Sequence, residues 1–266
     1  MKPRMPYFII AMSLMSLGAL CLVALPVLGM FSNTPISELL SLFGDGEVMA
    51  SIVLTFETAL YATLFAVVFG TPLAYILARY DFRGKRLVES MVSIPIMVPH
   101  TAAGIALLVV FATGPVGSFM SSLGLDFLGT KAGIALGMAF VSVPFYIDSV
   151  KDGFASVDRR IEYVARSLGA SPRQVFFQVM LPIAMRSVFT GSLLMWGRGI
   201  SEFGAVVILA YHPMIAPVLI YERFTSFGLK SSRPVAVLLV ALCIIVFILL
   251  RIISGLKVGR AENNRH

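Results

Sequence analysis

The chain has 266 residues, of which 58% are hydrophobic and only 13% are charged, and its mean hydropathy is +0.91. About a quarter of the residues in a soluble domain are charged, so this composition excludes an ordinary soluble protein and indicates an integral membrane protein. The net charge of +7 does not indicate nucleic-acid binding, because the basic residues are divided among short segments between apolar stretches.

Several apolar stretches are long enough to cross a membrane, which takes about 20 residues of helix. The first is too long for the apolar part of a secretory signal, so we expect it to be retained. The sequence therefore predicts an all-α membrane protein in which residues 1–266 form one transmembrane domain. The six expected spans lie at about residues 7–30, 48–78, 87–112, 131–150, 187–210 and 234–254.

Prolines interrupt three of the middle spans. Pro72 falls in the second, Pro95 and Pro99 in the third, and Pro144 in the fourth. Each proline removes a backbone hydrogen bond that lipid cannot replace, so helices, hydroxyl groups or an aqueous cavity must compensate. A kink that only improves packing is the alternative for any one proline. Because breakers are concentrated in residues 93–104, that stretch is a candidate for an internal pathway.

The longest polar segment, residues 151–186, separates the fourth and fifth spans. Residues 161–168 are good helix formers, and Gly169 can adopt the left-handed conformation that ends a helix. An N-cap residue, a first-turn proline and a capping-box partner then follow at Ser171, Pro172 and Gln174. This pattern predicts two short helices joined by a tight turn, which is either an ordinary loop or a surface held by another protein.

The distribution of lysine and arginine predicts the orientation. Sixteen of the 21 basic residues lie at the N-terminus, in residues 79–86, in residues 151–186, and from Arg251 to the C-terminus. The alternate segments hold four, and Arg198 lies within a span. Because cytoplasmic loops carry the excess of lysine and arginine, we expect both termini and residues 151–186 to face the cytoplasm.

The charged residues that fall within apolar spans include Glu57, Asp148, Arg198 and Glu202. A charge at the bilayer centre costs about 2.5–3.5 kcal/mol on insertion scales, so such residues need a partner or a role. Arg198 and Glu202 are four residues apart and share a helix face. If the span begins at Ser187, Arg198 lies about 16 Å along it, near the midplane.

Two interpretations of the Arg198 and Glu202 pair remain open. They neutralise each other and tighten helix packing, or Arg198 faces a pathway and offers positive charge to an anion. His100 is either a packed histidine or a hydrogen-bond donor to an oxyanion. Close approach of another helix is expected at Gly197, Gly199 and Gly204. The candidate pathway residues are Pro99, His100, Arg198, Ser201 and Glu202.

No catalytic, phosphate-binding or metal-binding pattern is present. The sequence lacks G-x-x-x-x-G-K-[ST], G-x-S-x-G and H-E-x-x-H. Cys21 and Cys243 lie in apolar stretches near opposite ends of the chain, and the three histidines are far apart. We therefore expect a non-catalytic chain that binds no metal or cofactor and takes its energy from a partner.

The spacing within the polar segment resembles the EAA signature of the permease subunits of ABC importers. That signature is E-A-A-x-x-x-G, nine residues, and then I-x-L-P. Ala165 and Gly169 match its third and seventh positions. Leu181 and Pro182 match its end, with Val179 in place of isoleucine.

The first two positions of the signature depart from the family pattern. They are Tyr163 and Val164, and a glutamate stands one place earlier, at Glu162, which leaves the role of that glutamate open. In the family, the two helices of this segment dock in a cleft of the ATPase. The resemblance thus implies ATPase-coupling residues at Glu162, Tyr163, Ala165, Arg166, Ser167, Leu168, Gly169, Ala170, Ser171 and Pro172.

Four further stretches resemble the molybdate/sulfate permease branch, most closely the archaeal-type molybdate/tungstate permeases. They are T-P-L-A-Y-I-L-A-R (71–79), V-P-H-T-A-A-G-I-A-L-L (98–108), R-G-I-S-E-F-G-A-V-V-I-L-A (198–210) and A-P-V-L-I-Y-E-R-F (216–224). The resemblance implies the type I importer fold, a homodimer of six-span subunits in the cell membrane, two cytoplasmic ATPase subunits that use ATP and Mg²⁺, and an external oxyanion-binding protein.

The expected function is ATP-driven import of a tetrahedral oxyanion by alternating access. Molybdate or tungstate is the first candidate substrate, and sulfate is the second. A self-sufficient secondary transporter or channel for an anion, using Glu57 and Arg198, is the alternative. A third class, an intramembrane enzyme, would need a clustered catalytic set that the sequence does not contain.

Overall fold

The computed structural model describes residues 7–263, and all regular elements in that range are helices, as predicted. Three of them, labelled η, are π-helical. The elements are α1 (Tyr7–Ser32), α2 (Ile36–Leu42), α3 (Gly46–Phe65), η1 (Ala66–Gly70), α4 (Thr71–Arg79), α5 (Lys85–Met97), α6 (His100–Leu107), η2 (Leu108–Thr113), α7 (Pro115–Ser122), α8 (Lys131–Ala155), α9 (Arg159–Ser167), α10 (Pro172–Gln174), η3 (Val175–Met180), α11 (Leu181–Ile200), α12 (Gly204–Leu209), α13 (Ala216–Phe227) and α14 (Leu229–Asn263).

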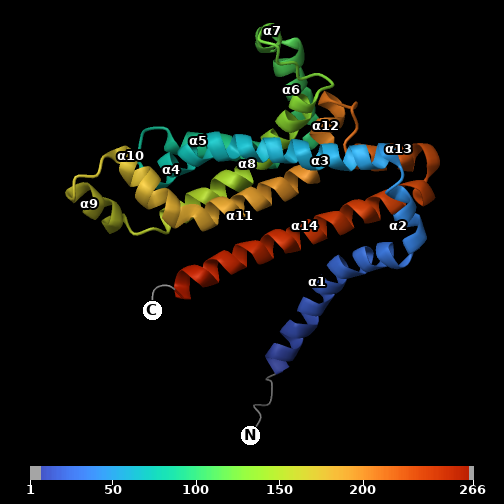
Figure 1. Ribbon diagram of the computed structural model, residues 1–266, viewed down its shortest axis with the longest axis horizontal. Helices are drawn as coiled ribbons and strands as arrows, with labels where there is room; N and C mark the ends of the chain where they lie inside the picture. The colour runs from blue at the N-terminus through green and yellow to red at the C-terminus, as the bar shows by residue number, and fades with distance from the viewer. Residues whose placement is uncertain (1–6, 264–266) are drawn as a thin grey trace.

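Five helical stretches are long and apolar enough to cross a membrane: Tyr7–Ser32, Gly46–Arg79, Lys131–Ala155, Pro172–Ile200 and Leu229–Leu250. Apart from Tyr7–Ser32, they form a bundle whose long axis is horizontal in Figure 1. The turn between α4 and α5, the α9 helix and the C-terminal end of α14 lie at one end of the bundle, and α2 and α13 lie at the other. Three of the segments expected on the cytoplasmic side, residues 79–86, residues 151–186 and the C-terminal end of α14, therefore gather at one end.

The expected third span is two helices instead of one straight crossing. Lys85–Met97 and His100–Thr113 meet at an angle of 113°. The break lies at Val98, whose backbone is extended (φ −77°, ψ 132°) because the residue before a proline is disfavoured in the α region. Beyond Pro99, α6 and α7 leave the side of the bundle (Figure 1).

The expected fifth span also differs from one helix over residues 187–210. A continuous helical stretch begins earlier, at Pro172, and ends at Ile200. The chain then turns before the short helix α12. The second short helix of the polar segment is therefore the beginning of this span, and Arg198 lies in its last turn rather than near its middle.

Each π-helical segment ends shortly before a proline. Segments η1, η2 and η3 precede Pro72, Pro115 and Pro182. Proline lacks an N–H and its ring crowds the carbonyl four residues earlier, and a wider turn relieves both problems. At the first of these sites the Thr71 hydroxyl also donates to the Val67 carbonyl at 2.6 Å. The helix passes Pro72 and Pro182 without breaking, whereas at Pro115 the extended backbone of Gly114 (φ −86°, ψ 177°) separates η2 from α7.

The expected mixed loop between the fifth and sixth spans is largely helical. It forms α13, which packs against α3 and α14. Arg223 on α13 donates to Asp45 Oδ2 at 2.8 Å and to Glu47 Oε2 at 2.9 Å. The hydrogen bond from Arg223 holds the pKa of the Asp45 carboxyl below its usual value. Asp45 also caps the N-terminus of α3, so these contacts join the two helices at their ends.

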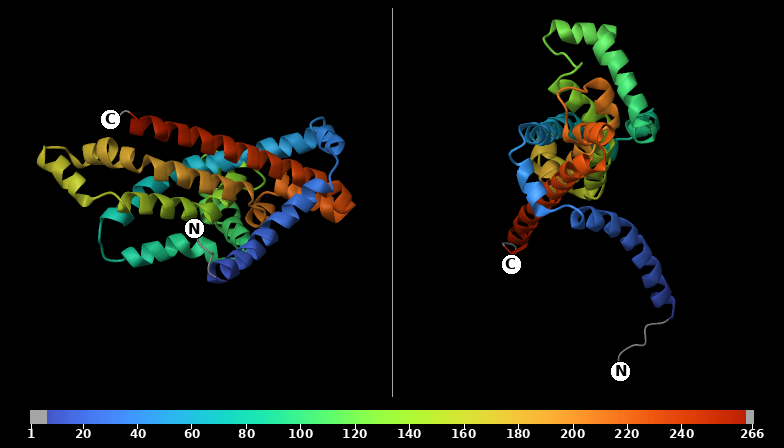
Figure 2. Two further views of the ribbon diagram at one scale, coloured as in Figure 1. Left: turned by 90° about the horizontal axis from the view of Figure 1, so that it is seen from below. Right: turned by 90° about the vertical axis from the view of Figure 1, so that its right-hand side faces the viewer.

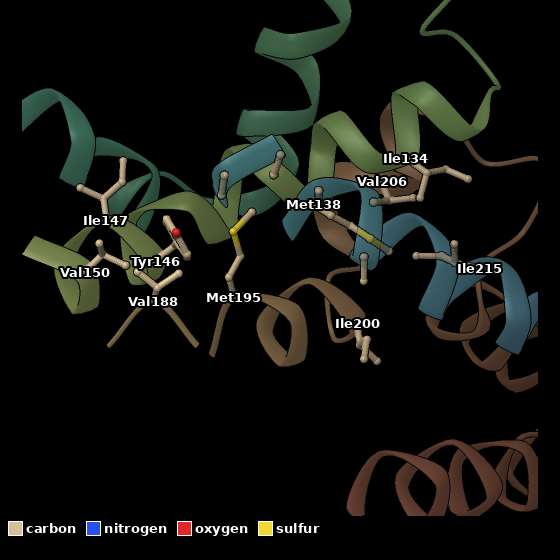
Figure 3. Packing of buried hydrophobic residues seen from close by; sticks show 14 of the residues in the cluster. Ile134, Met138, Tyr146, Ile147, Val150, Val188, Met195, Ile200, Val206 and Ile215 are labelled. Carbon is tan, nitrogen blue, oxygen red and sulfur yellow. The ribbon is translucent and has the colours of Figure 1, made fainter. Parts of the chain in front are cut away.

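The core lies where α8 and α11 cross α3 and α4, and Figure 3 shows the side chains that fill it. Small residues allow α8 and α11 to pack closely. Gly153 lies against Ser187, and Gly191 lies against Ser149, whose hydroxyl donates to the Ser187 carbonyl at 3.3 Å. Small residues at a helix contact are typical of membrane proteins, where association depends on close packing.

Helix α1 lies apart from this core. It has no buried residue, and the right-hand view of Figure 2 shows it leaving the bundle. Its apolar side chains therefore remain exposed in a single copy of the chain.

Candidate functional site

The first candidate region is the α9–α10 segment (residues 159–174) at one end of the bundle (Figure 1). Gly169 has φ +88°, the left-handed conformation expected at the end of α9. The backbone N–H of Ser171 donates to Gln174 Oε1 at 2.8 Å, and the Gln174 N–H donates to Ser171 Oγ at 3.3 Å. This capping box confirms the predicted tight turn.

The tip of the α9–α10 segment presents apolar and basic side chains to its surroundings. Leu168 is 83% exposed and Tyr163 is 60% exposed. Most of the other expected coupling residues are exposed too: Arg166, Ser167, Gly169, Ser171 and Pro172. Ala165 and Ala170 are partly buried and pack against the core. An exposed leucine and tyrosine on a protruding turn are typical of a protein-binding surface.

Glu162 differs from its neighbours, because its side chain faces the bundle. Glu162 Oε1 lies 2.7 Å from Arg79 Nε, and the two side chains are 10% and 4% exposed. Arg79 Nη2 also donates to the Val157 carbonyl at 2.8 Å. Glu162 therefore contacts the end of α4, and its Oε2 also lies 3.9 Å from Nη2 of the exposed Arg166 on its own helix. Arg79 and Glu162 are far apart in sequence, and no local pattern links them.

The second candidate region is centred on the fully buried carboxylate of Glu202. Its Oε2 lies 2.8 Å from His100 Nδ1 and 3.1 Å from Arg198 Nη2, and its Oε1 accepts the Ala205 N–H at 3.0 Å. The expected pairing of Arg198 with Glu202 is therefore present. We call His100, Arg198, Ser201 and Glu202 the Glu202 cluster.

The Glu202 cluster lies where two interrupted helices meet. Glu202 is in the turn between α11 and α12, and His100 opens α6 directly after Pro99. A Cβ atom at Gly204 would lie 2.6 Å from His100 Cβ, and one at Gly104 would lie 2.8 Å from the Ala205 carbonyl oxygen. Glycine is thus required for α6 and α12 to pack at this distance.

Of the three glycines expected to permit close helix approach, only Gly204 does so tightly. Gly199 makes an ordinary contact, and nothing lies within 4 Å of a Cβ placed at Gly197. Gly104, which the sequence did not single out for this helix contact, provides the other close approach. Its partner α12 is more than 90 residues further along the chain, so sequence position alone does not relate the two.

Two basic side chains of the cluster keep exposed edges. The side chain of His100 is 40% exposed, and that of Arg198 is 24% exposed. Arg198 Nη1 donates to the hydroxyl of Ser201 at 3.2 Å, and Nη2 lies 3.0 Å from His100 Nε2. The same Nη2 lies 3.1 Å from His100 Nδ1, so the guanidinium lies beside both ring nitrogens. The remaining guanidinium N–H groups can donate to an anion.

The other intramembrane carboxylates have separate partners. Glu57 Oε2 lies 2.8 Å from Lys131 Nζ, and Glu57 Oε1 accepts a hydrogen bond from the Tyr61 hydroxyl at 2.5 Å. Asp148 Oδ1 lies 3.5 Å from Lys151 Nζ. Among the described side chains, Glu57 is therefore paired with Lys131 and not with Arg198. Among the side chains that the structure describes, no three histidines, cysteines or carboxylates are grouped so that they could hold a metal ion.

Comparison with known proteins gives one family match and a set of close relatives. The family model "Binding-protein-dependent transport system inner membrane component" matches residues 70–257. The molybdate/tungstate transport system permease protein WtpB of Pyrococcus abyssi is 40% identical over 235 residues, which cover 88% of this chain and 90% of the relative. The probable sulfate transport system permease protein cysT of Nephroselmis olivacea is 34% identical over 256 residues, or 93% of this chain and 90% of the relative.

A solved structure shares the fold at low sequence identity. The chain superimposes on a subunit of a bacterial ABC transporter involved in the import of the acidic polysaccharide alginate, with a TM-score of 0.73 and 17% identity. The match covers 94% of this chain and 95% of the solved chain. At this identity the likeness concerns the fold, which is that of the type I importer permeases.

Proposed function

Because this chain belongs to the family of inner membrane components of binding-protein-dependent transport systems, we propose that it is the permease subunit of an ATP-driven importer for molybdate or tungstate. The observation that carries the substrate class is the 40% identity to a molybdate/tungstate permease over 90% of that protein. Sulfate is the second candidate, because a sulfate permease is 34% identical over a similar share. The chain itself is a multi-pass membrane protein.

The Glu202 cluster supports an anion pathway through this permease. In transporters, interrupted helices place polar groups at depths where lipid cannot solvate them, and substrates pass at such breaks. Here two breaks meet, and Arg198 and His100 have exposed edges beside them. Glu202 neutralises the guanidinium charge, which favours weak and reversible contact with a dianion over tight retention. Pro99 and Ser201 would flank the same route.

The α9–α10 segment supports docking of a separate ATPase. The chain has no phosphate-binding loop of its own, so hydrolysis of ATP with Mg²⁺ would take place in two cytoplasmic partner subunits. The exposed Leu168 and Tyr163 are suited to a cleft in such a partner. The excess of basic residues in the segments at this end of the bundle favours a cytoplasmic location for both termini and for the segment.

The mechanism that we infer is alternating access in a homodimer within the cell membrane. Closure of the ATPase pair would move the α9–α10 segment, and helices α8 and α11, which adjoin it on either side, would carry that movement to the breaks at His100 and Glu202. ATP and the loaded external oxyanion-binding protein drive transport only if both favour the outward-facing state. Selectivity among oxyanions would then rest mainly with the external protein.

A self-sufficient secondary transporter or channel is less well supported. That alternative uses Glu57 and Arg198 together, whereas Glu57 is paired with Lys131 and Tyr61. Arg198 is paired with Glu202. Neither contact brings the two residues into one site.

The test is uptake of radiolabelled molybdate and tungstate by cells that lack their own oxyanion importers. The permease is co-expressed with its ATPase and binding protein, and a second strain carries the ATPase with its phosphate-loop lysine replaced. We expect uptake only in the first strain. Uptake that survives loss of ATPase activity would support the secondary transporter. Titration of the binding protein with molybdate, tungstate and sulfate would identify the substrate, and failure to bind any of them would refute the oxyanion proposal.

A further inference from the structure

A buried ion pair joins the end of α4 to α9. Arg79, the last residue of α4, places Nε 2.7 Å from Glu162 Oε1, with both side chains almost fully enclosed. The same guanidinium donates through Nη2 to the Val157 carbonyl at 2.8 Å and lies 3.8 Å from Met180 Sδ. One side chain thus contacts α9, the junction between α8 and α9, and the stretch that leads into α11.

The burial of this pair is not explained by stability alone. Removing two charges from water costs about as much as their attraction returns, and apolar residues of similar size often stabilise such a site equally well. A buried pair does, however, fix the relative position of two elements, because its strength depends on geometry. The nearby pair of Lys85 and Asp81 differs, since the Asp81 side chain is 82% exposed.

Aromatic side chains extend the contact between α4 and the neighbouring helices. The ring of Tyr75 on α4 lies 5.2 Å from that of Phe154 on α8 and 4.8 Å from that of Phe176 in η3. The rings meet edge to face, an arrangement that favours a defined geometry. The last turns of α4, the end of α8 and the beginning of the fifth span therefore form one packed unit next to the Arg79–Glu162 pair.

We propose that the Arg79–Glu162 ion pair makes α9 and the end of α4 move as one body during transport. The two residues are positioning residues: they touch neither the ATPase nor the substrate, and they transmit movement of the α9–α10 segment to the second span. This inference rests on the proposed function. It adds α4, which is distant from that segment in sequence, to α8 and α11, which adjoin it in the chain.

The first test removes the charge of Glu162 and measures the coupling between ATP hydrolysis and oxyanion uptake. In Glu162→Gln we expect ATPase co-purification to be unchanged, because the exposed surface of the segment is intact. Oxyanion uptake should fall about tenfold while ATP hydrolysis continues, so that more ATP is consumed per ion. The matched control is Asp81→Asn, which removes the exposed pair with Lys85 and should leave uptake within about twofold of the parent.

The second test replaces the ion pair by a covalent link. Cys21 and Cys243 are first changed to serine, and Arg79→Cys is combined with Glu162→Cys. Uptake should be low in this variant and should recover to within about twofold of the cysteine-free parent when a short bifunctional thiol reagent joins the two positions. Recovery also shows that the variant is folded.

Three results would overturn the proposal. They are normal uptake by Glu162→Gln, loss of ATPase association in that variant, and a cross-link that blocks uptake in the double-cysteine variant. The first shows that the pair is dispensable, the second places Glu162 in the ATPase contact, and the third shows that α4 and α9 must separate. Failure of the proposed function itself is recognised separately, because the unmodified parent would then show no ATP-dependent oxyanion uptake.

Discussion

The Glu202 carboxylate organises the contacts at the junction of α6, α11 and α12. It is fully buried, is hydrogen-bonded to His100 and the Ala205 backbone N–H, and is ion-paired with Arg198, so its charge is compensated from three directions. A buried carboxylate without such partners would be strongly unfavourable. The partners in turn keep the turn after Ile200 close to the start of α6. Glu202 therefore mainly holds this junction together, while the side chains of Arg198 and His100 remain partly exposed.

Removing the guanidinium of Arg198 alone should lower the free energy of unfolding more than removing the side chains of both Arg198 and Glu202. Arg198→Ala leaves a buried carboxylate without its guanidinium, and we expect the free energy of unfolding to fall by about 3 kcal/mol. Combining it with Glu202→Ala removes the unpaired charge, so the double variant should be the more stable of the two. Chemical unfolding of the purified protein in detergent measures both. Equal or greater loss in the double variant would show that neutralisation is not the main role of Arg198.

At the scale of the helix, prolines have two different outcomes in this chain. At Pro72 and Pro182, each of which follows a π segment, the helix continues. Where the preceding residue is extended, as at Val98 before Pro99, the helix breaks. The break, and not the proline itself, creates the site, because it brings a helix N-terminus and His100 against the turn at Glu202.

The turn of the α9–α10 segment gives a prediction at the same scale. Gly169→Val places a β-branched side chain at φ +88°, where an L-residue is strained by about 1–2 kcal/mol. We expect membrane insertion to be normal and co-purification of the ATPase to be weakened. Gly84→Val is the matched control, because Gly84 has φ +89° and an equally open surrounding but lies in the turn between α4 and α5. Equal loss of the ATPase in both variants would argue against docking on the α9–α10 segment.

At the scale of the whole molecule, one copy of the chain leaves large apolar surfaces without a protein partner. Helix α1 has no buried residue, and α6 and α7 leave the side of the bundle with exposed side chains such as Ile105 and Phe119. Extended apolar surface of this kind is typical of contact with lipid or with another subunit. These surfaces are therefore available for contact with lipid or with another subunit.

The stoichiometry of the assembled complex tests this view. We expect native mass spectrometry of the complex, purified through a tag on the ATPase, to give two permease copies and two ATPase copies. A differently tagged second permease should co-purify with the first. Recovery of a single permease copy for each pair of ATPases would contradict the homodimer.

The sequence by itself determined the class of fold and the local structure of the α9–α10 turn. A bilayer requires apolar helices of about 20 residues, and capping depends on neighbours within a few positions, so both signals are local. Hydropathy located the first, second, fourth and sixth spans to within a few residues but placed the fifth too late in the chain, and the pattern Ser171, Pro172 and Gln174 located the capping box. The orientation of the termini and the choice of oxyanion stay predictions.

Only the tertiary structure decided which distant residues meet. The 113° bend after α5, the contact of His100 with Glu202, and the burial of Glu162 against Arg79 join residues that are remote in sequence. Sequence patterns did not indicate the last of these, because a charged residue on an amphipathic helix is usually exposed. Its partner is chosen by how α4, α8 and α9 pack together. The physical reason is that periodicity and capping act within a few residues, whereas the pairing of buried charges depends on the distances that packing creates.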